Sequence, residues 1–373
     1  MLGAERLPMV SILVPVRDEE RVVGRLLDAL LRLDYPQGKR EILIVEDGSG
    51  DETVGICAEY ARRYPDQIRL FHKSTSNGKP SALNYALQYV RGEIVAVFDA
   101  DNVPEPDALT RAVGYFKDSS IAAVQGRTCS INADENMLTK FISYEEAVYY
   151  ETFIRGKDAL SLFVPLSGNC QFVRRSVLER VGGWDEDSLS EDMEMAVKLT
   201  VRGYTIKYAP DVRSWQESPA NLSQLMSQRT RWYRGCMEVG LRYGKLVTKL
   251  SRKNIDTEFT LVSPYMFPLW LLGYIMAIYA FLVPIQHHPV VMVVTQVTSV
   301  FTMILSLIAG IALIYVTKPR RITNVLWLPF VYMYWSVQTF IAIYALAQII
   351  LKRPRSWTKT MKTGAVMKIS VAR

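Results

Sequence analysis

Two aspartates, Asp99 and Asp101, follow the apolar run Val95–Phe98 and stand two positions apart. In an extended chain, residues two apart point to the same side, so both carboxylates are expected to face one space and repel each other there. A divalent cation relieves such repulsion. Mg2+ and Mn2+ favour carboxylate oxygens and usually complete their shell with substrate phosphates. The pair therefore predicts a metal-bridged diphosphate, although Asp-X-Asp alone also arises often by chance.

The elements that must position this pair form a repeating pattern. Apolar runs at 9–16, 41–47, 68–73 and 93–101 lack strict alternation, as expected of strands covered on both faces. Helical patterns fill the gaps between them at 18–33, 50–64 and 79–90. In the first, Asp18 can cap the start and the apolar residues form one stripe: Val22, Val23, Leu26, Leu27 and Leu30. Strand, helix, strand at this spacing predicts an α/β domain with a mostly parallel sheet.

Polar residues collect at the carboxyl ends of all four predicted strands. The stretches are "VRDEE", "EDGSGDET", "SNGKPS" and "DADN". Taken singly, each is an ordinary turn or helix cap. Ligands of open α/β sheets bind outside the carboxyl ends of the strands, so the four together predict a nucleotide-binding crevice.

The second half of the chain has a different character. No Asp, Glu, Lys or Arg occurs from Phe259 to Thr317 or from Ile322 to Leu351, which is long enough to cross a bilayer several times. We expect an all-α transmembrane region at 258–352, with spans near 260–284, 290–316 and 324–351, between a cytoplasmic enzyme domain at 1–240 and a basic tail at 353–373. The first residues lead directly into the predicted strand at 9–16, and they do not resemble a signal peptide.

Composition bounds the function further. The chain is 49% hydrophobic with a formal net charge of +7. Its basic residues cluster beside the apolar segments, which is typical of a cytoplasmic membrane face and argues against nucleic acid as a partner. The four cysteines are far apart and lack metal-ligand spacing, so reduced thiols are expected: Cys57, Cys129, Cys170 and Cys236.

Two helical segments are candidates for the membrane surface, one near 135–154 and one near 222–245. In the second, Gln228, Arg231 and Trp232 stand at i, i+3 and i+4, hence on one helix face. Apolar residues recur at helical spacing with arginines between them, as in an interfacial helix. An ordinary core helix has the same periodicity, and the position just before the apolar spans favours the interface.

The motifs occur in an order that resembles the family 2 glycosyltransferases, inverting enzymes that use nucleotide-sugar donors and have a GT-A (Rossmann-like) fold. The resemblance is to the membrane-embedded processive branch with cellulose, chitin and hyaluronan synthases. It covers about residues 9–240. The stretches that carry it are "VPVRDEE", "VEDGSGDET", "NGKPSALNYAL", "FDADN", "SGNCQFVRR", "SEDMEMAVKL" and "QRTRWYRG".

The resemblance implies a role for each matching residue. Asp47 would hold the base, with Pro15 and Glu19 shaping that pocket, and Lys79 would lie near the nucleotide. Asp99 would contact the nucleotide and diphosphate, and Asp101 would ligate Mg2+ or Mn2+ together with Asp99. Asp192 would be the catalytic base, on a floor lined by Gln228, Arg231 and Trp232.

These roles agree with the chemistry of sugar transfer. The enzyme must stabilise a departing diphosphate and take a proton from the incoming hydroxyl, tasks for a cation with an arginine and for a carboxylate respectively. Glu191 and Asp192 also suit a simpler role as acidic residues at a helix N-terminus.

Three functions remain open at this point. The first is a processive β-glycosyltransferase that extends a polysaccharide from a cytosolic, UDP-linked sugar, with or without coupled export. The second is single transfer to a membrane lipid. A transporter or sensor with a degenerate nucleotide domain is a third class, which the retained Asp99, Asp101 and Asp192 argue against.

The number of membrane crossings also remains open. Three crossings would leave the basic tail outside, against the positive-inside tendency, so one apolar segment is expected to be re-entrant or interfacial. Pro264 and Pro268 point to the first segment, and Pro329 interrupts the third. The tail stretch "WTKT" resembles a family element expected on the cytoplasmic side.

Overall fold

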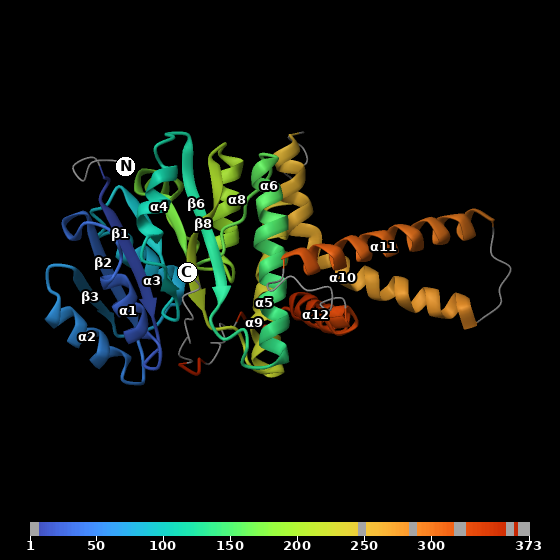
Figure 1. Ribbon diagram of the computed structural model, residues 1–373, viewed down its shortest axis with the longest axis horizontal. Coiled ribbons are helices and arrows are strands. Elements are labelled where there is room, and N and C mark those ends of the chain that lie inside the picture. The colour runs from blue at the N-terminus through green and yellow to red at the C-terminus, as the bar shows by residue number, and fades with distance from the viewer. Residues whose placement is uncertain (1–6, 245–250, 283–288, 317–325, 356–361, 365–373) are drawn as a thin grey trace.

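A computed structural model describes residues 7–244, 251–282, 289–316, 326–355 and 362–364 (Figure 1). The predicted loop "TKPRRIT", the tail stretch "WTKT" and most of the basic tail lie outside the described residues.

One mixed sheet of eight strands forms the centre of the N-terminal part, in the order β3-β2-β1-β4-β7-β6-β8-β5. The strands β3, β2, β1 and β4 run parallel, β7 is antiparallel to β4 and β6, β8 is parallel to β6, and β5 is antiparallel to β8. The prediction of a parallel sheet therefore holds for the first half of the sheet. The strand bounds are β1 Val10–Val16, β2 Arg40–Asp47, β3 Ile68–Lys73, β4 Ile94–Val97, β5 Val103–Pro104, β6 Ile121–Ser130, β7 Gln171–Arg174 and β8 Thr205–Gln216.

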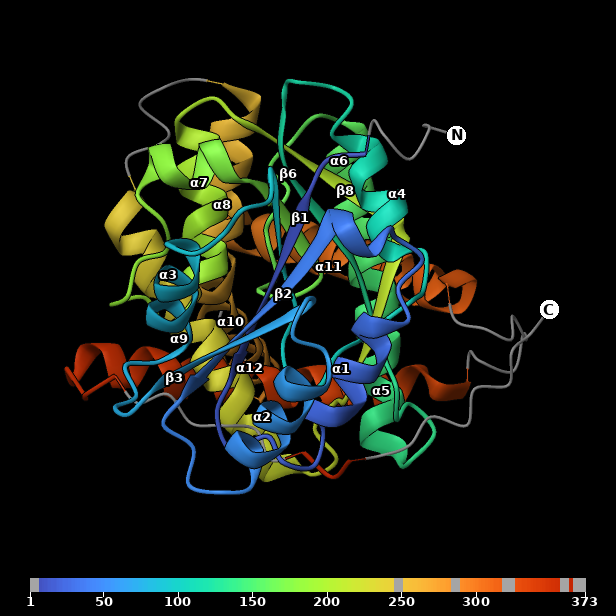
Figure 2. The same ribbon diagram turned by 90° about the vertical axis from the view of Figure 1, so that its left-hand side faces the viewer.

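Helices cover both faces of the sheet (Figures 1 and 2). One face packs α1 (Val23–Leu31), α2 (Thr53–Arg63) and α4 (Ala108–Tyr115), and the other packs α3 (Lys79–Leu87), α7 (Arg175–Val181) and α8 (Glu191–Val201). Covering on both faces explains why the strands are apolar at nearly every position. The three crossovers through α1, α2 and α3 place the carboxyl ends of β1, β2, β3 and β4 along one edge of the sheet.

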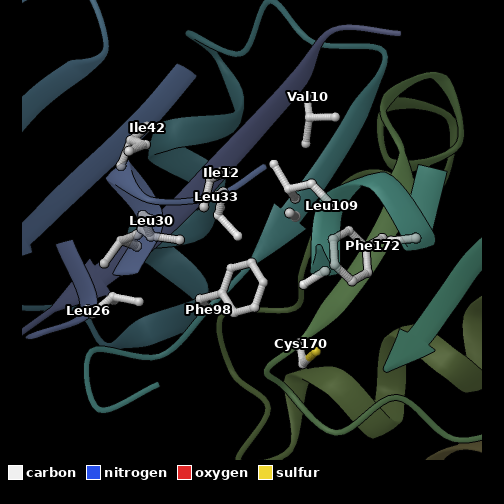
Figure 3. Packing of buried hydrophobic residues seen from close by; sticks show 14 of the residues in the cluster. Val10, Ile12, Leu26, Leu30, Leu33, Ile42, Phe98, Leu109, Cys170 and Phe172 are labelled. Carbon is white, nitrogen blue, oxygen red and sulfur yellow. The ribbon is translucent and has the colours of Figure 1, made fainter. Parts of the chain in front are cut away.

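The larger core cluster confirms the predicted stripe of the first helix. Leu26 and Leu30 are fully buried against Ile12, Ile42 and Phe98 (Figure 3). Burial of one such side chain contributes about 2 kcal/mol. The described cysteines are free, and Cys170 lies in this cluster as a small apolar side chain.

Two local predictions at the sheet edge are wrong. Strand β4 ends at Val97, and the Asn102 N–H donates to the Asp99 carbonyl at 3.0 Å, so Asp99 and Asp101 lie in a turn and not on a strand. Asp18 does not cap α1: its φ is 53°, and its Oδ1 accepts a hydrogen bond from the Gly50 N–H at 2.7 Å. That contact ties the loop after β1 to the loop after β2.

A second group of helices lies on the far side of the sheet from β3 (Figure 1). It comprises α5 (Met137–Val148), a π-helical stretch (Tyr149–Ile154), α6 (Arg155–Ala159), α9 (Leu222–Tyr243), α10 (Arg252–Leu282), α11 (Pro289–Val316) and α12 (Leu328–Ile350). Helices α10 and α11 extend together away from the sheet. Helix α12 is seen nearly end-on in Figure 1 and lengthwise in Figure 2, so it runs across their direction and packs on α9 and α10.

Two of these helices are long and apolar enough to cross a membrane by length and composition. They are Met292–Ala312 within α11 and Pro329–Ile350 within α12. The α11 segment is unburied, whereas a third of the α12 segment is buried against the rest of the protein. The two helices therefore share a composition but not an environment.

Candidate active site

The loop after β3 encloses Asp47, the last residue of β2. Asp47 Oδ2 accepts hydrogen bonds from Ser76 Oγ at 2.6 Å and from the Gly78 N–H at 3.0 Å, and Lys73 Nζ lies 3.0 Å from Oδ1. The carboxylate is therefore fixed at the strand end, where it could accept further hydrogen bonds from a base. Gly78 has a φ of 89°, which a glycine adopts without strain.

Pro15 and Glu19 lie on the β1 side of the same edge. Pro15 is half-buried within β1, opposite Val45 of β2. The Glu19 backbone N–H donates to Thr53 Oγ1 at 2.7 Å, which joins the loop after β1 to the start of α2. The three residues predicted for the base pocket thus lie at the neighbouring carboxyl ends of β1 and β2.

Lys79, the first residue of α3, forms ion pairs with Asp99, in the turn after β4, and with Glu191 of α8. Its Nζ lies 2.6 Å from Asp99 Oδ1 and 3.4 Å from Glu191 Oε1, and it donates to the Gly168 carbonyl at 2.8 Å. Burial alone would lower the pKa of Lys79, but Asp99 and Glu191 outweigh it and raise the pKa above its usual value. Lys79 therefore stays charged, and it is a built part of the site and not a solvated loop lysine.

Asp101 has a different cationic partner, which the sequence did not reveal. Lys362 Nζ lies 2.6 Å from Asp101 Oδ2 and donates to the Glu217 carbonyl at 3.0 Å. Glu217 in turn accepts from the Thr363 N–H at 2.9 Å and pairs with Arg25 at 3.1 Å. The segment Lys362–Gly364 therefore lies directly on the carboxylate that was predicted to bind a metal.

Asp192 lies in the first turn of α8 and is partly open to solvent. Its Oδ1 accepts a hydrogen bond from the Met193 N–H at 2.7 Å. Burial and the adjacent Glu191 raise the pKa of Asp192 to about 7, against the opposing charges of Lys79 and Arg231. A carboxylate with a pKa near the working pH suits a general base.

Two glycines allow the elements of the site to approach closely. A Cβ at Gly168 would lie 2.9 Å from Asp192 Oδ2 and 3.1 Å from Lys79 Nζ. A Cβ at Gly235 of α9 would collide with the side chain of Ser190, the residue just before α8. Because these positions have no side chain, the "SGN" loop (167–169) and α9 can both reach the Asp192 turn.

Helix α9 carries the predicted floor residues with different exposures. Gln228 is buried, Arg231 is half-buried, and the Trp232 side chain is 37% exposed. The Arg229 guanidinium stacks over the Trp232 ring at 4.5 Å from its centroid and pairs with Glu145 of α5 at 2.6 Å. Trp232 is therefore held as an open aromatic surface near the charged centre.

The residues around Asp101 fit a divalent cation whose shell a substrate completes. No cluster of three or more metal-ligating side chains forms among the described residues. However, ammonium groups occupy the cation position at both Asp99 and Asp101, and the buried Asn102 Oδ1 has no hydrogen-bond partner in the described part of the chain. Mg2+ and Mn2+ commonly use one or two carboxylates and complete their shell with phosphate oxygens, which suits this set of donors.

Comparison with known proteins agrees with this geometry. A family model described as "Glycosyltransferase like family 2" matches residues 8–235. The chain belongs to this glycosyltransferase family. Within the family it is 31% identical to the beta-monoglucosyldiacylglycerol synthase of Trichormus variabilis over 96% of this chain and 77% of that protein.

Other relatives match a smaller share of the chain. The probable glycosyltransferase YdaM of Bacillus subtilis is 35% identical over 67% of this chain and 60% of that protein. The poly-beta-1,6-N-acetyl-D-glucosamine synthase of Staphylococcus epidermidis is 31% identical over 62% and 56%. The chain thus spans little more than half the length of these two proteins.

A solved structure of another glycosyltransferase has the same fold. It is the mannosyltransferase PcManGT from Pyrobaculum calidifontis in complex with GDP-Man and Mn2+, with a TM-score of 0.65 and 22% identity, covering 95% of this chain and 90% of that chain. The chain is therefore a family 2 glycosyltransferase with a mixed, Rossmann-like α/β sheet consistent with GT-A.

Sequence reasoning missed four residues of the site: Glu191 and Gly168 beside Lys79, and Lys362 and Glu217 beside Asp101. Glu191 and Gly168 were within the quoted stretches "SEDMEMAVKL" and "SGNCQFVRR", so a closer reading of those stretches could have found them. No local pattern identifies Lys362 or Glu217, because their contact joins segments far apart in the chain.

Proposed function

We propose that the protein is a membrane-bound inverting glycosyltransferase that transfers one sugar from a nucleotide-sugar, UDP-linked by preference, to the hydroxyl of a membrane lipid. The observation that carries this proposal is the position of Asp192, which lies between the charged donor centre at Lys79 and the helix α9 that packs against the apolar helices. A lipid hydroxyl arriving from the membrane surface would reach this carboxylate first.

In this mechanism Asp192 removes the proton of the acceptor hydroxyl as that oxygen attacks the sugar carbon opposite the leaving diphosphate. Asp47, Pro15 and Glu19 orient the nucleotide. Lys79 and Arg231 stabilise the negative charge of the departing diphosphate. A divalent cation held by Asp101 and Asp99 would add charge neutralisation there. Gln228 and Trp232 form the surface on which the acceptor lies, with the sugar or lipid headgroup against the indole ring.

The apolar helices support a membrane location. We propose that α10 and α11 cross the bilayer and that α12 lies along its surface, buried on one side through Val331, Tyr334 and Gln338 and exposed on the other through Phe330, Met333 and Phe340. Helix α11 has 28 residues, about 42 Å of helix, which exceeds the hydrocarbon thickness.

This arrangement resolves the conflict over the basic tail. Two crossings return the chain to the side of the enzyme domain, where Lys362 contacts Asp101. The segments 135–154 and 222–245 would face the headgroup region, which agrees with exposed apolar side chains such as Phe153, Leu222 and Met226.

A second candidate is the processive synthesis of a polysaccharide, as in the cellulose, chitin and hyaluronan synthase branch. The Gln228, Arg231 and Trp232 pattern and the similarity to the Staphylococcus epidermidis polysaccharide synthase favour it. The similarity to the lipid glucosyltransferase runs through the C-terminal helices as well and favours a lipid acceptor.

One experiment separates the two. The full chain in detergent is incubated with a panel of labelled UDP- and GDP-sugars plus diacylglycerol, and the products are sized. A single labelled glycolipid supports the proposal, and a ladder of long products supports the polysaccharide reading instead. The absence of transfer from any donor in the panel contradicts both.

A further inference from the structure

An open pocket of about 680 Å3 lies between α9 and the C-terminal end of α12. Five basic side chains and one acidic side chain line it: Arg234, Arg242, Lys352, Arg353, Arg355 and Glu238. None of these residues contributes to the transfer mechanism described above.

Within the part of the chain that the structure describes, three of the five basic side chains form ion pairs with carboxylates, and two do not. Glu238 pairs with Arg234 and with Arg355, each at 2.9 Å, and Arg242 pairs with Asp185 and Glu194. Five cations thus face three carboxylates, an excess of two. Among the described residues no carboxylate pairs with Lys352 or Arg353, and both side chains are exposed.

The backbone presents these two residues in an unusual way. The Lys352 N–H donates to the Ile349 carbonyl and the Arg353 N–H to the Gln348 carbonyl, so α12 ends in a Schellman motif with Lys352 at the left-handed position. Its φ is 50°, where glycine is the usual residue and a lysine costs about 1 kcal/mol. Arg234 donates to the Arg353 carbonyl at 2.6 Å, and this contact fixes the turn over α9. The turn therefore holds Lys352 and Arg353 side by side at the rim of the pocket.

The pocket also has an apolar side. Leu241 and Ile349 line it, and the pocket directly follows the apolar stretch Pro329–Ile350. Cations at the end of an apolar surface helix lie at the depth of lipid phosphates. A soluble phosphate would need the cations alone, whereas a phospholipid would use both the cations and the apolar rim.

We propose that this pocket binds the phosphate headgroup of an anionic phospholipid and thereby fixes α12 and α9 on the membrane surface. The proposal uses the membrane placement proposed above but not the identity of the acceptor or the donor. The phosphate would lie between Lys352 and Arg353, and an acyl chain would lie along Ile349 and the exposed face of α12.

The test uses the full chain in detergent and counts retained lipids by native mass spectrometry, with phosphatidylglycerol and phosphatidylcholine of identical acyl chains. The variant Lys352→Gly with Arg353→Gln removes both charges and leaves the Schellman turn with its preferred residue, so it is expected to fold. Each lost charge removes one favourable interaction with the lipid phosphate. Together the two losses should weaken the retention of phosphatidylglycerol on the order of 25-fold. The control variant Arg62→Gln with Arg63→Gln removes the same charge from exposed positions on α2 and should retain the lipid as the wild type does.

Three outcomes would overturn the proposal: equal phosphatidylglycerol retention by the pocket variant and the wild type, equal retention of phosphatidylcholine by the wild type, or displacement of the lipid by an equal concentration of glycerol 3-phosphate. The last outcome would assign the pocket to a soluble phosphate. Sugar transfer is measured on the same samples, and the pocket variant should keep it in detergent. A wild type that retains the anionic lipid but transfers no sugar would contradict the proposed function and leave the lipid site standing.

Discussion

The two sides of the site differ in the charged groups that lie beside their carboxylates. The donor side comprises Asp47, Asp99 and Asp101, and the acceptor side comprises Asp192. On the donor side each aspartate is in contact with an ammonium group: Asp47 with Lys73, Asp99 with Lys79 and Asp101 with Lys362. On the acceptor side Asp192 lies beside a second carboxylate, Glu191, and its pKa rises to about 7. The donor side is thus prepared for charged ligands, and the acceptor side for a proton.

One edge of the sheet can serve two chemical tasks because different elements position the carboxylates and the groups that contact them. Strand ends and the loops that follow them position the donor side, where each of the three aspartates contacts an ammonium group. Helices α8 and α9 position the acceptor side, where Gly168 and Gly235 let the neighbouring elements approach the turn at Asp192 closely. Lys79 contacts both Asp99 and Glu191 and so joins the two sides.

The largest effect is expected from Asp192→Asn, which removes the base and leaves the donor side intact. Transfer should fall by about 100- to 10,000-fold, the usual contribution of a general base, while donor binding stays within about twofold. Turnover and donor affinity are measured on the same preparation. Asp187→Asn in the exposed loop before α8 is the matched control. A near-normal turnover in Asp192→Asn would show that the acceptor side uses another base.

A second substitution, Asp101→Asn, tests the donor side. It should weaken the Mn2+-dependent part of donor binding by more than about 100-fold, since loss of a residue that only supports a metal ligand already costs 10- to 100-fold. Calorimetric titration with UDP, with and without Mn2+, gives the metal-dependent part. An unchanged metal dependence would show that Asp101 does not bind the metal. The donor side would then not differ from the acceptor side by holding a cation at Asp101.

The pH dependence of turnover separates the two sides further. Asp192 must be deprotonated to accept a proton, so the rate should rise with pH, reach half its maximum near the pKa of about 7 and fall about tenfold per unit below it. Glu191→Gln removes the neighbouring negative charge and should move this limb to lower pH. Donor binding at saturating metal should not follow the same limb. If Glu191→Gln leaves the limb in place, another group than Asp192 is titrating.

Parts of the site were predictable because they depend on local sequence. The end of β2 at Asp47 and the polar turn after β4 follow from apolar runs that stop at polar residues, and the floor on α9 follows from the spacing of Gln228, Arg231 and Trp232. The turn at 99–101 was mistaken for strand because the run stays apolar up to Phe98, one residue past the end of β4, and Ala100 is apolar again. Periodicity reports burial, and Phe98 and Ala100 are buried whether or not the backbone is extended.

The partners of these residues were not predictable from local patterns. Asp101 meets Lys362, and Glu145 of α5 meets Tyr334 of α12 at 2.7 Å, through contacts that only the packing of distant helices creates. The orientation of α12 has the same origin. Its composition is that of a membrane span, and the contacts with α9 and α10 are what lay it across them.

The smallest expected effect concerns Lys362. It tests whether the ammonium group beside Asp101 occupies the position of a divalent cation. A cation and the Lys362 ammonium would compete for the same Asp101 oxygen, so Lys362→Met should strengthen Mn2+ binding in the absence of donor. The gain should be about fivefold, as expected for the loss of an interaction of about 1 kcal/mol. Electron paramagnetic resonance of free Mn2+ measures it on the full chain. Lys73→Met makes the same charge change at Asp47 and should leave Mn2+ binding unchanged. If Lys362→Met binds Mn2+ more weakly, Lys362 orders the site instead of competing for it, and the ammonium groups of the donor side are then structural and not stand-ins for a cation.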